Sequence, residues 1–170
     1  DELSDVFESL QERVNQLNNY DQKLADLNIR KKDIFKHLSN LSAELSLKRK
    51  SIIPKLVNDL ESLLSSLGMP NAKFKIDMSD SGSFLSNGSD IISFLLKANK
   101  GGEFLPLKKG ASGGELSRIM LAVKYILSKH QQLPSIIFDE IDTGVSGEIS
   151  NKIASIMKEM SNYMQVFTIT

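Results

Sequence analysis

The sequence predicts an α/β fold in which a mostly parallel sheet is flanked by helices and preceded by a long coiled-coil helix. Residues 1–50 contain no glycine and no proline, and apolar residues recur there at alternating steps of three and four, which is the pattern of a coiled-coil seam. The last part of the sequence alternates helical patterns with the short apolar runs PSIIFDE and MQVFTIT, which are typical of strands buried on both faces of a parallel sheet. We therefore divide the chain into a coiled-coil arm segment, residues 1–50, and a globular lobe, residues 51–170.

The boundaries of the remaining elements follow from helix breakers and from the period of the apolar residues. Pro54 is expected to interrupt the arm helix and to occupy the first turn of a second helix, which Gly68 and Pro70 end. On the same grounds we expect strands at 71–78, 91–99, 134–140 and 164–170, a turn-rich connection at 79–90, and helices from about Gly113 to His130 and at 146–162.

The composition excludes several classes of protein. Lys and Arg together number 21, and so do Asp and Glu, so no overall positive field attracts nucleic acid and any DNA contact has to be local. The absence of cysteine excludes a disulfide scaffold and thiolate metal sites, and no apolar run approaches the ~20 residues of a membrane helix. From the lack of such a run we expect no membrane partner. Because the sequence starts in a helical pattern without an initiating Met and stops in an apparent strand, we expect a piece of a longer protein.

The stretch GASGGELSRIML, residues 110–121, places glycines and serines directly before an amphipathic helix. Glycine lets a backbone approach another molecule closely, and a helix N-terminus exposes unpaired N–H groups that carry partial positive charge. Ser112, Gly113, Gly114 and Glu115 therefore indicate an anion site, with phosphate as the usual ligand. A serine followed three residues later by a glutamate is also the pattern of a capping box, and this simpler interpretation does not exclude the first.

Two acids, Asp139 and Glu140, end the apolar run that predicts a buried strand. Ligands of open parallel sheets bind beyond the carboxyl ends of the strands. An aspartate there suits Mg²⁺, which prefers oxygen ligands, and the adjacent glutamate can polarise an attacking water as a general base. Solvated acids at a strand end are the alternative, but the order of glycine-opened helix and acid-ended strand favours a nucleotide-hydrolysing site.

These motifs resemble those of the ABC and SMC-type ATPases. SGGELSR looks like the ABC signature motif, IIFDEID looks like the Walker B motif of the SMC branch, and TGVSGE lies where the D-loop of that family lies. From about Ile52 to Thr170 the chain is most similar to the RecN family, bacterial SMC-type ATPases of DNA double-strand-break repair and recombination. Residues 1–50 resemble the returning half of an antiparallel coiled coil. The resemblance implies a P-loop NTPase-like head, ATP and Mg²⁺ as cofactors, and a place in the bacterial cytoplasm near the nucleoid.

In that family two heads sandwich ATP, and the resemblance implies a role for each matching residue. Ser112 would offer its hydroxyl, and Gly113 and Gly114 their N–H groups, to the γ-phosphate of ATP held by a second copy of the protein. Glu115 would contact the ribose or order the loop, and Arg118 would pair with Glu115 or face the partner head.

The same resemblance assigns the chemical step to the acids. Asp139 would serve Mg²⁺ through water, and Glu140 would be the catalytic base. The D-loop would cross the interface between the heads and comprises Asp142, Thr143, Gly144 and Ser146.

The sequence contains no G-x-x-x-x-G-K-[ST], so it lacks a Walker A motif. In SMC-like proteins the Walker A lobe precedes the coiled coil, so the resemblance implies that this chain holds about half of a head. Its implied partners are its own N-terminal lobe, the other coiled-coil strand, a second copy of the protein, and DNA. We therefore expect that the chain alone neither binds ATP tightly nor hydrolyses it, and that it self-associates through the arm seam or a sheet edge.

Two alternatives stay open on the sequence. The chain could belong to another chromosome-maintenance ATPase of the SMC and Rad50 branch. It could instead be a structural coiled-coil interaction module whose nucleotide site no longer functions, although the joint presence of the glycine-opened helix, Asp139 and Glu140 argues against this.

Overall fold

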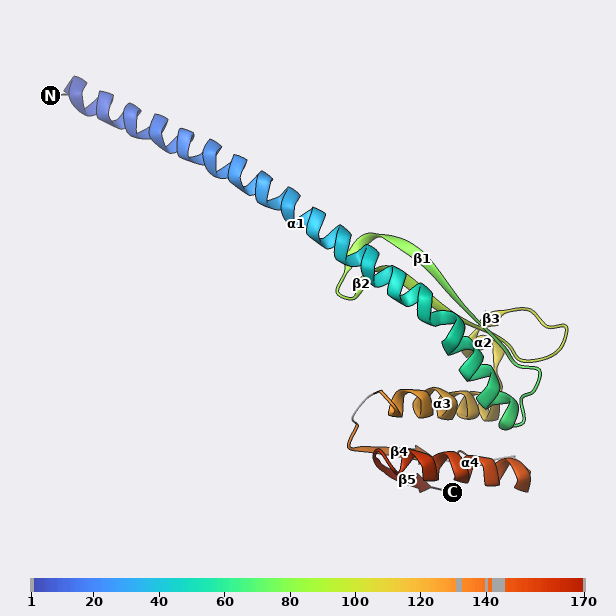
Figure 1. The fold of residues 1–170 in the computed structure, drawn as a ribbon. Coiled ribbons are helices and arrows are strands. Elements are labelled where there is room, and N and C mark those ends of the chain that lie inside the picture. The colour runs from blue at the N-terminus through green and yellow to red at the C-terminus, as the bar shows by residue number, and fades with distance from the viewer. Residues whose placement is uncertain (1, 131–132, 140, 142–145, 170) are drawn as a thin grey trace. The chain divides into compact units, whose positions relative to one another are not determined.

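The structure is a computed structural model that describes residues 2–130, 133–139, 141 and 146–169. In chain order its elements are α1 (Glu2–Ser66), β1 (Lys73–Leu85), β2 (Gly88–Lys97), β3 (Leu105–Pro106), α2 (Leu107–Gly110), α3 (Gly113–Ser128), β4 (Ser135–Asp139), α4 (Gly147–Met160) and β5 (Gln165–Ile169), as labelled in Figure 1. None of the helices in the described ranges is both long and apolar enough to span a membrane.

The chain forms two compact units. The first unit contains residues 1–47 together with residues 82–89, and the second contains residues 48–81 and 90–170. The helix α1 and both long strands, β1 and β2, therefore contribute residues to each unit.

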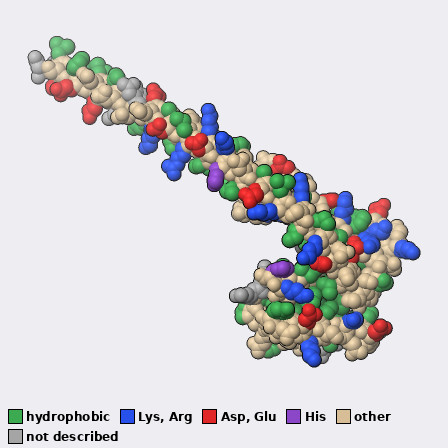
Figure 2. All heavy atoms as spheres, in the orientation of Figure 1, with side chains coloured by type: hydrophobic (Ala, Val, Ile, Leu, Met, Phe, Trp, Pro, Cys, Tyr) green, Lys and Arg blue, Asp and Glu red, His purple; other side chains and the backbone are tan. Residues whose placement is uncertain are grey.

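The first unit is built on the N-terminal part of α1, whose apolar seam is open to solvent. Leu24, Leu27, Ile34 and Leu41 are all about half exposed, and Figure 2 shows hydrophobic side chains between charged ones along this helix. Helix is the expected outcome because the segment contains no glycine or proline. The seam spacing is that of a coiled coil, and the pairing of this helix with a second one stays a prediction.

The helix α1 runs without interruption through Pro54, so the predicted break at that residue is wrong. Proline lacks the N–H that would bond the carbonyl of Lys50, but its ring fixes φ at a value that a helix accepts. Pro54 and Lys50 are both exposed, so solvent can reach the carbonyl that the proline leaves unpaired. The following turns are held by Leu60 and Leu64, which are buried in the core.

The end of α1 is a Schellman-type cap around Gly68, as the position of this glycine predicts. Gly68 has a φ of +78°, in the left-handed region that favours glycine. The Met69 N–H donates to the Leu64 carbonyl at 2.9 Å, and the Gly68 N–H donates to the Ser65 carbonyl at 3.3 Å. Because Leu64 and Met69 are both buried, the cap also fixes where the chain leaves the helix within the core.

The described strands form two small sheets, so the prediction of one mostly parallel sheet is wrong. The strands β4 and β5 do pair in parallel, with Ile137 opposite Phe167. The other sheet has the order β1-β2-β3, and its β2–β3 pair is antiparallel. The physical reason lies in the connections. Parallel strands need a long crossover, which α4 supplies between β4 and β5, whereas the two residues 86–87 between β1 and β2 suffice only for an antiparallel hairpin.

The predicted turn at residues 79–90 is wrong in its extent. β1 continues to Leu85, and the turn is confined to residues 86–87. Most positions of β1 beyond residue 78 are exposed, so the polar side chains there remain in water while the backbone pairs as a strand. Within the first unit, the Phe84 ring meets the Phe35 ring of α1 edge to face, with centroids 5.3 Å apart.

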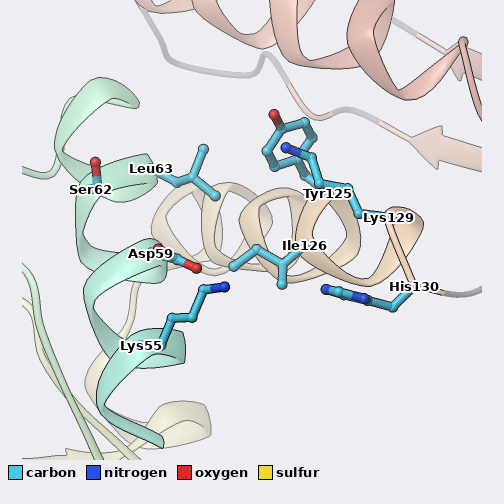
Figure 3. Close-up of a pocket in the computed structure, with 8 residues that line it drawn as sticks. All are labelled: Lys55, Asp59, Ser62, Leu63, Tyr125, Ile126, Lys129 and His130. Carbon is cyan, nitrogen blue, oxygen red and sulfur yellow. The ribbon is translucent and has the colours of Figure 1, made fainter. Parts of the chain in front are cut away.

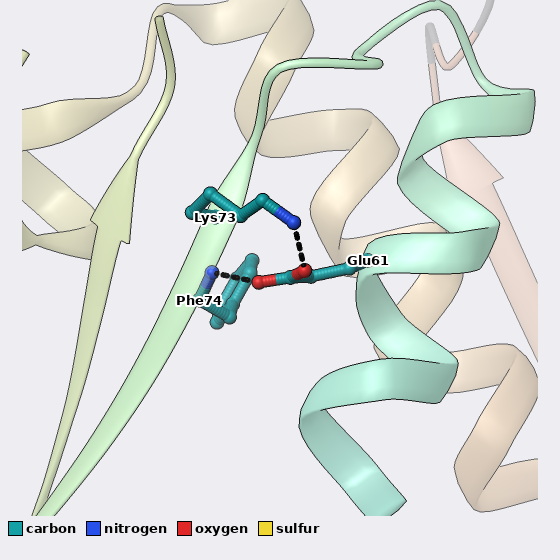
Figure 4. Close-up of polar contacts among 3 residues, drawn as sticks. All are labelled: Glu61, Lys73 and Phe74. Carbon is teal, nitrogen blue, oxygen red and sulfur yellow. Dashed lines mark hydrogen bonds and ion pairs between the residues drawn. The ribbon is translucent and has the colours of Figure 1, made fainter. Parts of the chain in front are cut away.

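The core lies in the second unit, between the end of α1, α3, β4 and α4. Its fully buried large side chains are Leu60, Leu64, Leu67, Leu96, Ile119, Leu121 and Met160. Polar contacts join α1 to the hairpin strands at the margin of this core. Glu61 accepts hydrogen bonds from the Phe74 backbone N–H at 2.9 Å and from Lys73 Nζ at 2.6 Å (Figure 4). Arg49 and Asp90 form a partly buried ion pair at 2.7 Å.

Candidate functional site

The helix α3 begins at the stretch that the sequence marks as an anion site, with Ser112 as its N-cap. The Glu115 N–H donates to Ser112 Oγ at 3.5 Å, and the Ser112 N–H donates to Glu115 Oε2 at 2.8 Å. The capping-box interpretation is thus confirmed. Glu115 orders the start of the helix, which is one of the two roles predicted for it, and its contact with a ribose stays a prediction.

The start of α3 is open on its outer side. Ser112, Gly113 and Gly114 are all exposed. A Cβ placed on Gly113 would meet no atom within 4 Å, and its φ lies outside the left-handed region. In the part of the chain that the structure describes, the Gly113 and Gly114 amides have no hydrogen-bond acceptor. Neither packing nor backbone strain therefore requires a glycine at position 113, and two donors of a positive helix end face outward.

Arg118 lies one turn beyond the capping box, on the inner side of α3. Its Nε is buried and has no hydrogen-bond partner among the described residues. Its Nη1 lies 3.9 Å from where a Cβ on Gly68 would be, and the same Cβ would overlap the side chain of Ile149 in the first turn of α4. Gly68 thus allows the end of α1 to approach the second turn of α3 and the first turn of α4. The predicted pairing of Arg118 with Glu115 is not seen, since the Glu115 carboxylate bonds the backbone of Ser112.

Asp139 is the last residue of β4 and pairs with Ile169 of β5. It is exposed, whereas Phe138 and Ile141 on either side of the acidic pair are buried, so the carboxyl group faces away from the core. An exposed carboxylate at a strand end suits a cation held through water. Among the residues that the structure describes, no three His, Cys, Asp or Glu side chains gather into a metal site.

The predicted D-loop residues are described only at their end. Ser146 is the N-cap of α4, and its side chain makes no capping hydrogen bond within the described ranges. The other members of the predicted catalytic and D-loop set, Glu140, Asp142, Thr143 and Gly144, lie outside the described residues, and their roles stay predictions.

A cavity of about 480 Å³, which no motif of the sequence indicates, lies between α1 and the C-terminal end of α3. Figure 3 shows its lining residues, among which Lys55 and His130 point toward the space between the two helices. The residues that line it are Lys55, Asp59, Ser62, Leu63, Tyr125, Ile126, Lys129 and His130. They come from two segments far apart in the chain, so no local pattern could have shown them together. Lys129 and His130 lie at the C-terminal end of α3, where a positive charge interacts favourably with the helix dipole, so their presence there does not require a ligand.

Tyr125, Lys129 and Glu159 form a polar cluster beside this cavity that joins the ends of α3 and α4. Lys129 Nζ lies 4.2 Å from the centre of the Tyr125 ring and 3.5 Å from Glu159 Oε1. Burial raises the pKa of Tyr125, and hydrogen bonding with Tyr125 raises the pKa of Lys129. Hydrogen bonding from Tyr125 lowers the pKa of Glu159, and the charge of Lys129 lowers it further. The cluster is therefore a structural contact at the end of α3 that lies away from Ser112.

The fold of the chain is similar to that of solved Smc head domains. The Smc head domain with a coiled coil and joint derived from Pyrococcus yayanosii aligns with a TM-score of 0.54 at 20% identity, over 75% of this chain and 24% of that one. An Smc head domain with an extended coiled coil, bound to the C-terminal domain of ScpA and derived from Pyrococcus furiosus, aligns with a TM-score of 0.53 at 21% identity, over 71% of this chain and 29% of that one. The chain has the fold of part of an SMC-type head.

The sequence relatives are more specific. The chain is 34% identical to the DNA repair protein RecN of Halalkalibacterium halodurans over 174 residues, which cover 100% of this chain and 31% of that protein. It is 34% identical to RecN of Bacillus subtilis over 186 residues, 99% of this chain and 32% of the relative. No protein-family model matches the chain. The chain is a homologue of RecN, as the motifs predict, and it spans about a third of the length of these curated relatives.

Proposed function

We propose that this chain is the C-terminal part of the ATPase head of a bacterial SMC-type DNA double-strand-break repair protein. ATP would clamp two heads together and hydrolysis would release them, so that the cycle gates the engagement of DNA. The similarity to RecN over the whole chain supports the family, and the motifs SGGELSR and IIFDEID support the chemistry. The protein would act in the cytoplasm near the nucleoid.

The observation that carries this proposal is the open start of α3. Ser112 and Glu115 cap the helix, but nothing within the described chain accounts for Gly113, whose missing side chain leaves only open space. A glycine in that position lets a phosphate from outside the chain come within hydrogen-bonding distance of the exposed amides. We infer that the γ-phosphate of ATP held by a second copy occupies this place.

The remaining roles follow the order of the residues along the chain. Asp139, exposed at the carboxyl end of β4, would hold Mg²⁺ through water, and the cation would neutralise phosphate charge in the transition state. Glu140 would accept the proton of the attacking water. Asp142, Thr143, Gly144 and Ser146 would lie across the interface between heads. Because the Walker A motif is absent from this sequence, we expect no ATP turnover by the 170-residue chain alone.

Two substitutions at Ser112 separate the cap from the phosphate contact. Aspartate caps a helix as well as serine does, so Ser112→Asp preserves the stability of the chain, whereas Ser112→Ala lowers it by about 1 kcal/mol. Ser112→Asp places a carboxylate where we expect the γ-phosphate. ATP hydrolysis by the full-length protein should fall by at least about 10²-fold in Ser112→Asp.

Glu140→Gln tests the catalytic base in the same assay. Turnover by the full-length protein, measured with and without linear DNA, should fall by about 10²–10⁴-fold. DNA stimulation of the unsubstituted protein would support the repair function. Unchanged turnover in both Ser112→Asp and Glu140→Gln would refute the proposed site and favour a structural coiled-coil module.

A further inference from the structure

The cavity between α1 and the end of α3, here called the α1–α3 pocket, has the size of a ligand site. Its volume of about 480 Å³ lies within the roughly 300–1,000 Å³ of known ligand pockets. Lys55, Asp59 and Leu63 are spaced four residues apart, so they line the pocket from one face of α1. Ile126 and His130, also four residues apart, line it from the end of α3. Figure 3 shows the polar ends of Lys55, Asp59 and His130 directed into the same space.

Two basic side chains of the α1–α3 pocket have no partner among the described residues. Lys55 and His130 are both exposed, and neither side chain makes a hydrogen bond or an ion pair there. Lys129 differs, because its Nζ lies 3.5 Å from Glu159 Oε1. The dipole of α3 accounts for His130 at the helix end, but Lys55 lies in the interior of α1, where the dipole has no such effect. An anionic group between Lys55 and His130 would contact both.

The other lining residues suit a peptide better than a nucleic acid backbone. Leu63 and Ile126 pack against the core and give the pocket an apolar wall. Asp59 also has no partner among the described residues, and an ionised carboxylate can only accept hydrogen bonds. A peptide supplies backbone N–H donors and apolar side chains. A phosphodiester backbone supplies neither, and its negative charge would be repelled by Asp59.

We propose that the α1–α3 pocket binds a short acidic segment of a partner protein. A carboxylate of the segment contacts Lys55 Nζ and the His130 imidazole. An apolar side chain beside that carboxylate packs on Leu63 and Ile126, and a backbone N–H of the segment donates to Asp59. The pocket lies at the C-terminal end of α3, away from the helix start that carries the proposed phosphate contact. Binding of the segment therefore does not require nucleotide.

Fluorescence anisotropy with the full-length protein tests this proposal in the absence of nucleotide. The probe is a short fluorescein-labelled peptide of alternating aspartate and leucine, and the control peptide has asparagine in place of each aspartate. The acidic peptide should bind and the control peptide should not. Lys55→Met and His130→Ala should each raise the dissociation constant of the acidic peptide by about tenfold or more, because each removes a hydrogen bond to a carboxylate. Lys50→Met is the matched control, since Lys50 is exposed on the same helix and does not line the pocket, and it should not change the affinity.

Several results would overturn the peptide site. They are a lack of binding by the acidic peptide, an unchanged affinity in Lys55→Met or His130→Ala, and an equal loss of affinity in Lys50→Met, which would show that only overall charge matters. A DNA duplex is titrated against the same variants. A loss of DNA affinity as large as the loss of peptide affinity would identify nucleic acid as the occupant instead. Because Lys55 and His130 are exposed, both variants should keep the urea midpoint of the unsubstituted protein.

Discussion

Replacing Gly113 by alanine should stabilise the chain and impair the full-length protein. Gly113 is the first residue of α3, its φ is one that alanine adopts, and no atom lies within 4 Å of the added Cβ. Alanine is favoured over glycine in helices, and it reduces the freedom of the unfolded chain, so we expect a gain of about 0.4–1 kcal/mol in the free energy of unfolding. The same methyl group would stand between the exposed amides and an approaching phosphate. We expect ATP turnover by the full-length protein to fall by about 10²-fold or more.

Urea unfolding of the isolated chain and ATP hydrolysis by the full-length protein measure the two effects separately. Gly147→Ala is the control for stability, because Gly147 is the first residue of α4 and its added Cβ also meets nothing within 4 Å. Both alanine variants should be stabilised by a similar amount. A destabilised Gly113→Ala chain would show that the start of α3 is packed differently. Full turnover in Gly113→Ala would refute the close approach of a phosphate at this helix end.

Substitutions at Gly68, Glu61 and Glu159 test a close approach between helices, a hydrogen bond and a pH dependence of stability. Gly68→Ala should lower the free energy of unfolding by about 2–4 kcal/mol, because position 68 has a φ of +78° and the added Cβ would overlap a side chain of α4. Gly101→Ala is the control, since position 101 has a φ of +86° but lies in open space, and it should lower the free energy of unfolding by only about 1–2 kcal/mol. Equal losses in urea unfolding would contradict the overlap. Glu61→Gln removes an exposed ion pair and should lower the free energy of unfolding by about 0.2–1 kcal/mol. Glu61→Ala should lower it by about 1–3 kcal/mol more, because a part-buried backbone N–H of β1 also loses its acceptor. Similar unfolding midpoints for the two variants would exclude that hydrogen bond. The lowered pKa of Glu159 predicts a contribution to stability that is present above its ordinary value of 4.5 and is lost as the pH falls through the folded-state pKa, whereas the raised pKa of Lys129 predicts a contribution that is lost as the pH rises above 10.5. Urea midpoints measured against pH should show a loss of stability on the acid side, and Glu159→Gln should reduce that loss. An unchanged pH profile in Glu159→Gln would refute the contribution of this carboxylate.

The long helix and the parallel β–α–β unit could be predicted because their signals are local. Fifty residues without a breaker, and two apolar runs separated by a helical pattern, determine those elements almost alone. The continuation of α1 past Pro54 could not be predicted in this way, because it depends on the packing of the following turns against a core built from distant segments. The extent of β1 was missed because serines and aspartates signal turns in general and are also tolerated on an exposed strand face.

The candidate site divides in the same way. The capping pattern at Ser112 and the two acids that end the predicted strand were visible in the sequence because each pattern lies within a few residues. The approach of α1 to α3 and α4 at Gly68 was not visible in the sequence, because it joins three elements that are distant in the chain. The unpaired Nε of Arg118 is likewise a property of packing, and no spacing rule indicates it.

The cap and the proposed phosphate contact would not compete for Ser112, because they would use different parts of one hydroxyl group. In the capping box Ser112 Oγ accepts a hydrogen bond from the Glu115 N–H. The hydroxyl proton is not used in that bond and remains free to be donated. Glu115 meanwhile takes up the Ser112 N–H, which leaves the exposed Gly113 and Gly114 amides as the outward donors of the helix end. The capping box therefore leaves the hydroxyl proton and both amides available for the proposed phosphate contact. A residue that caps without a proton to donate, as in Ser112→Asp, should retain the fold and lose that contact.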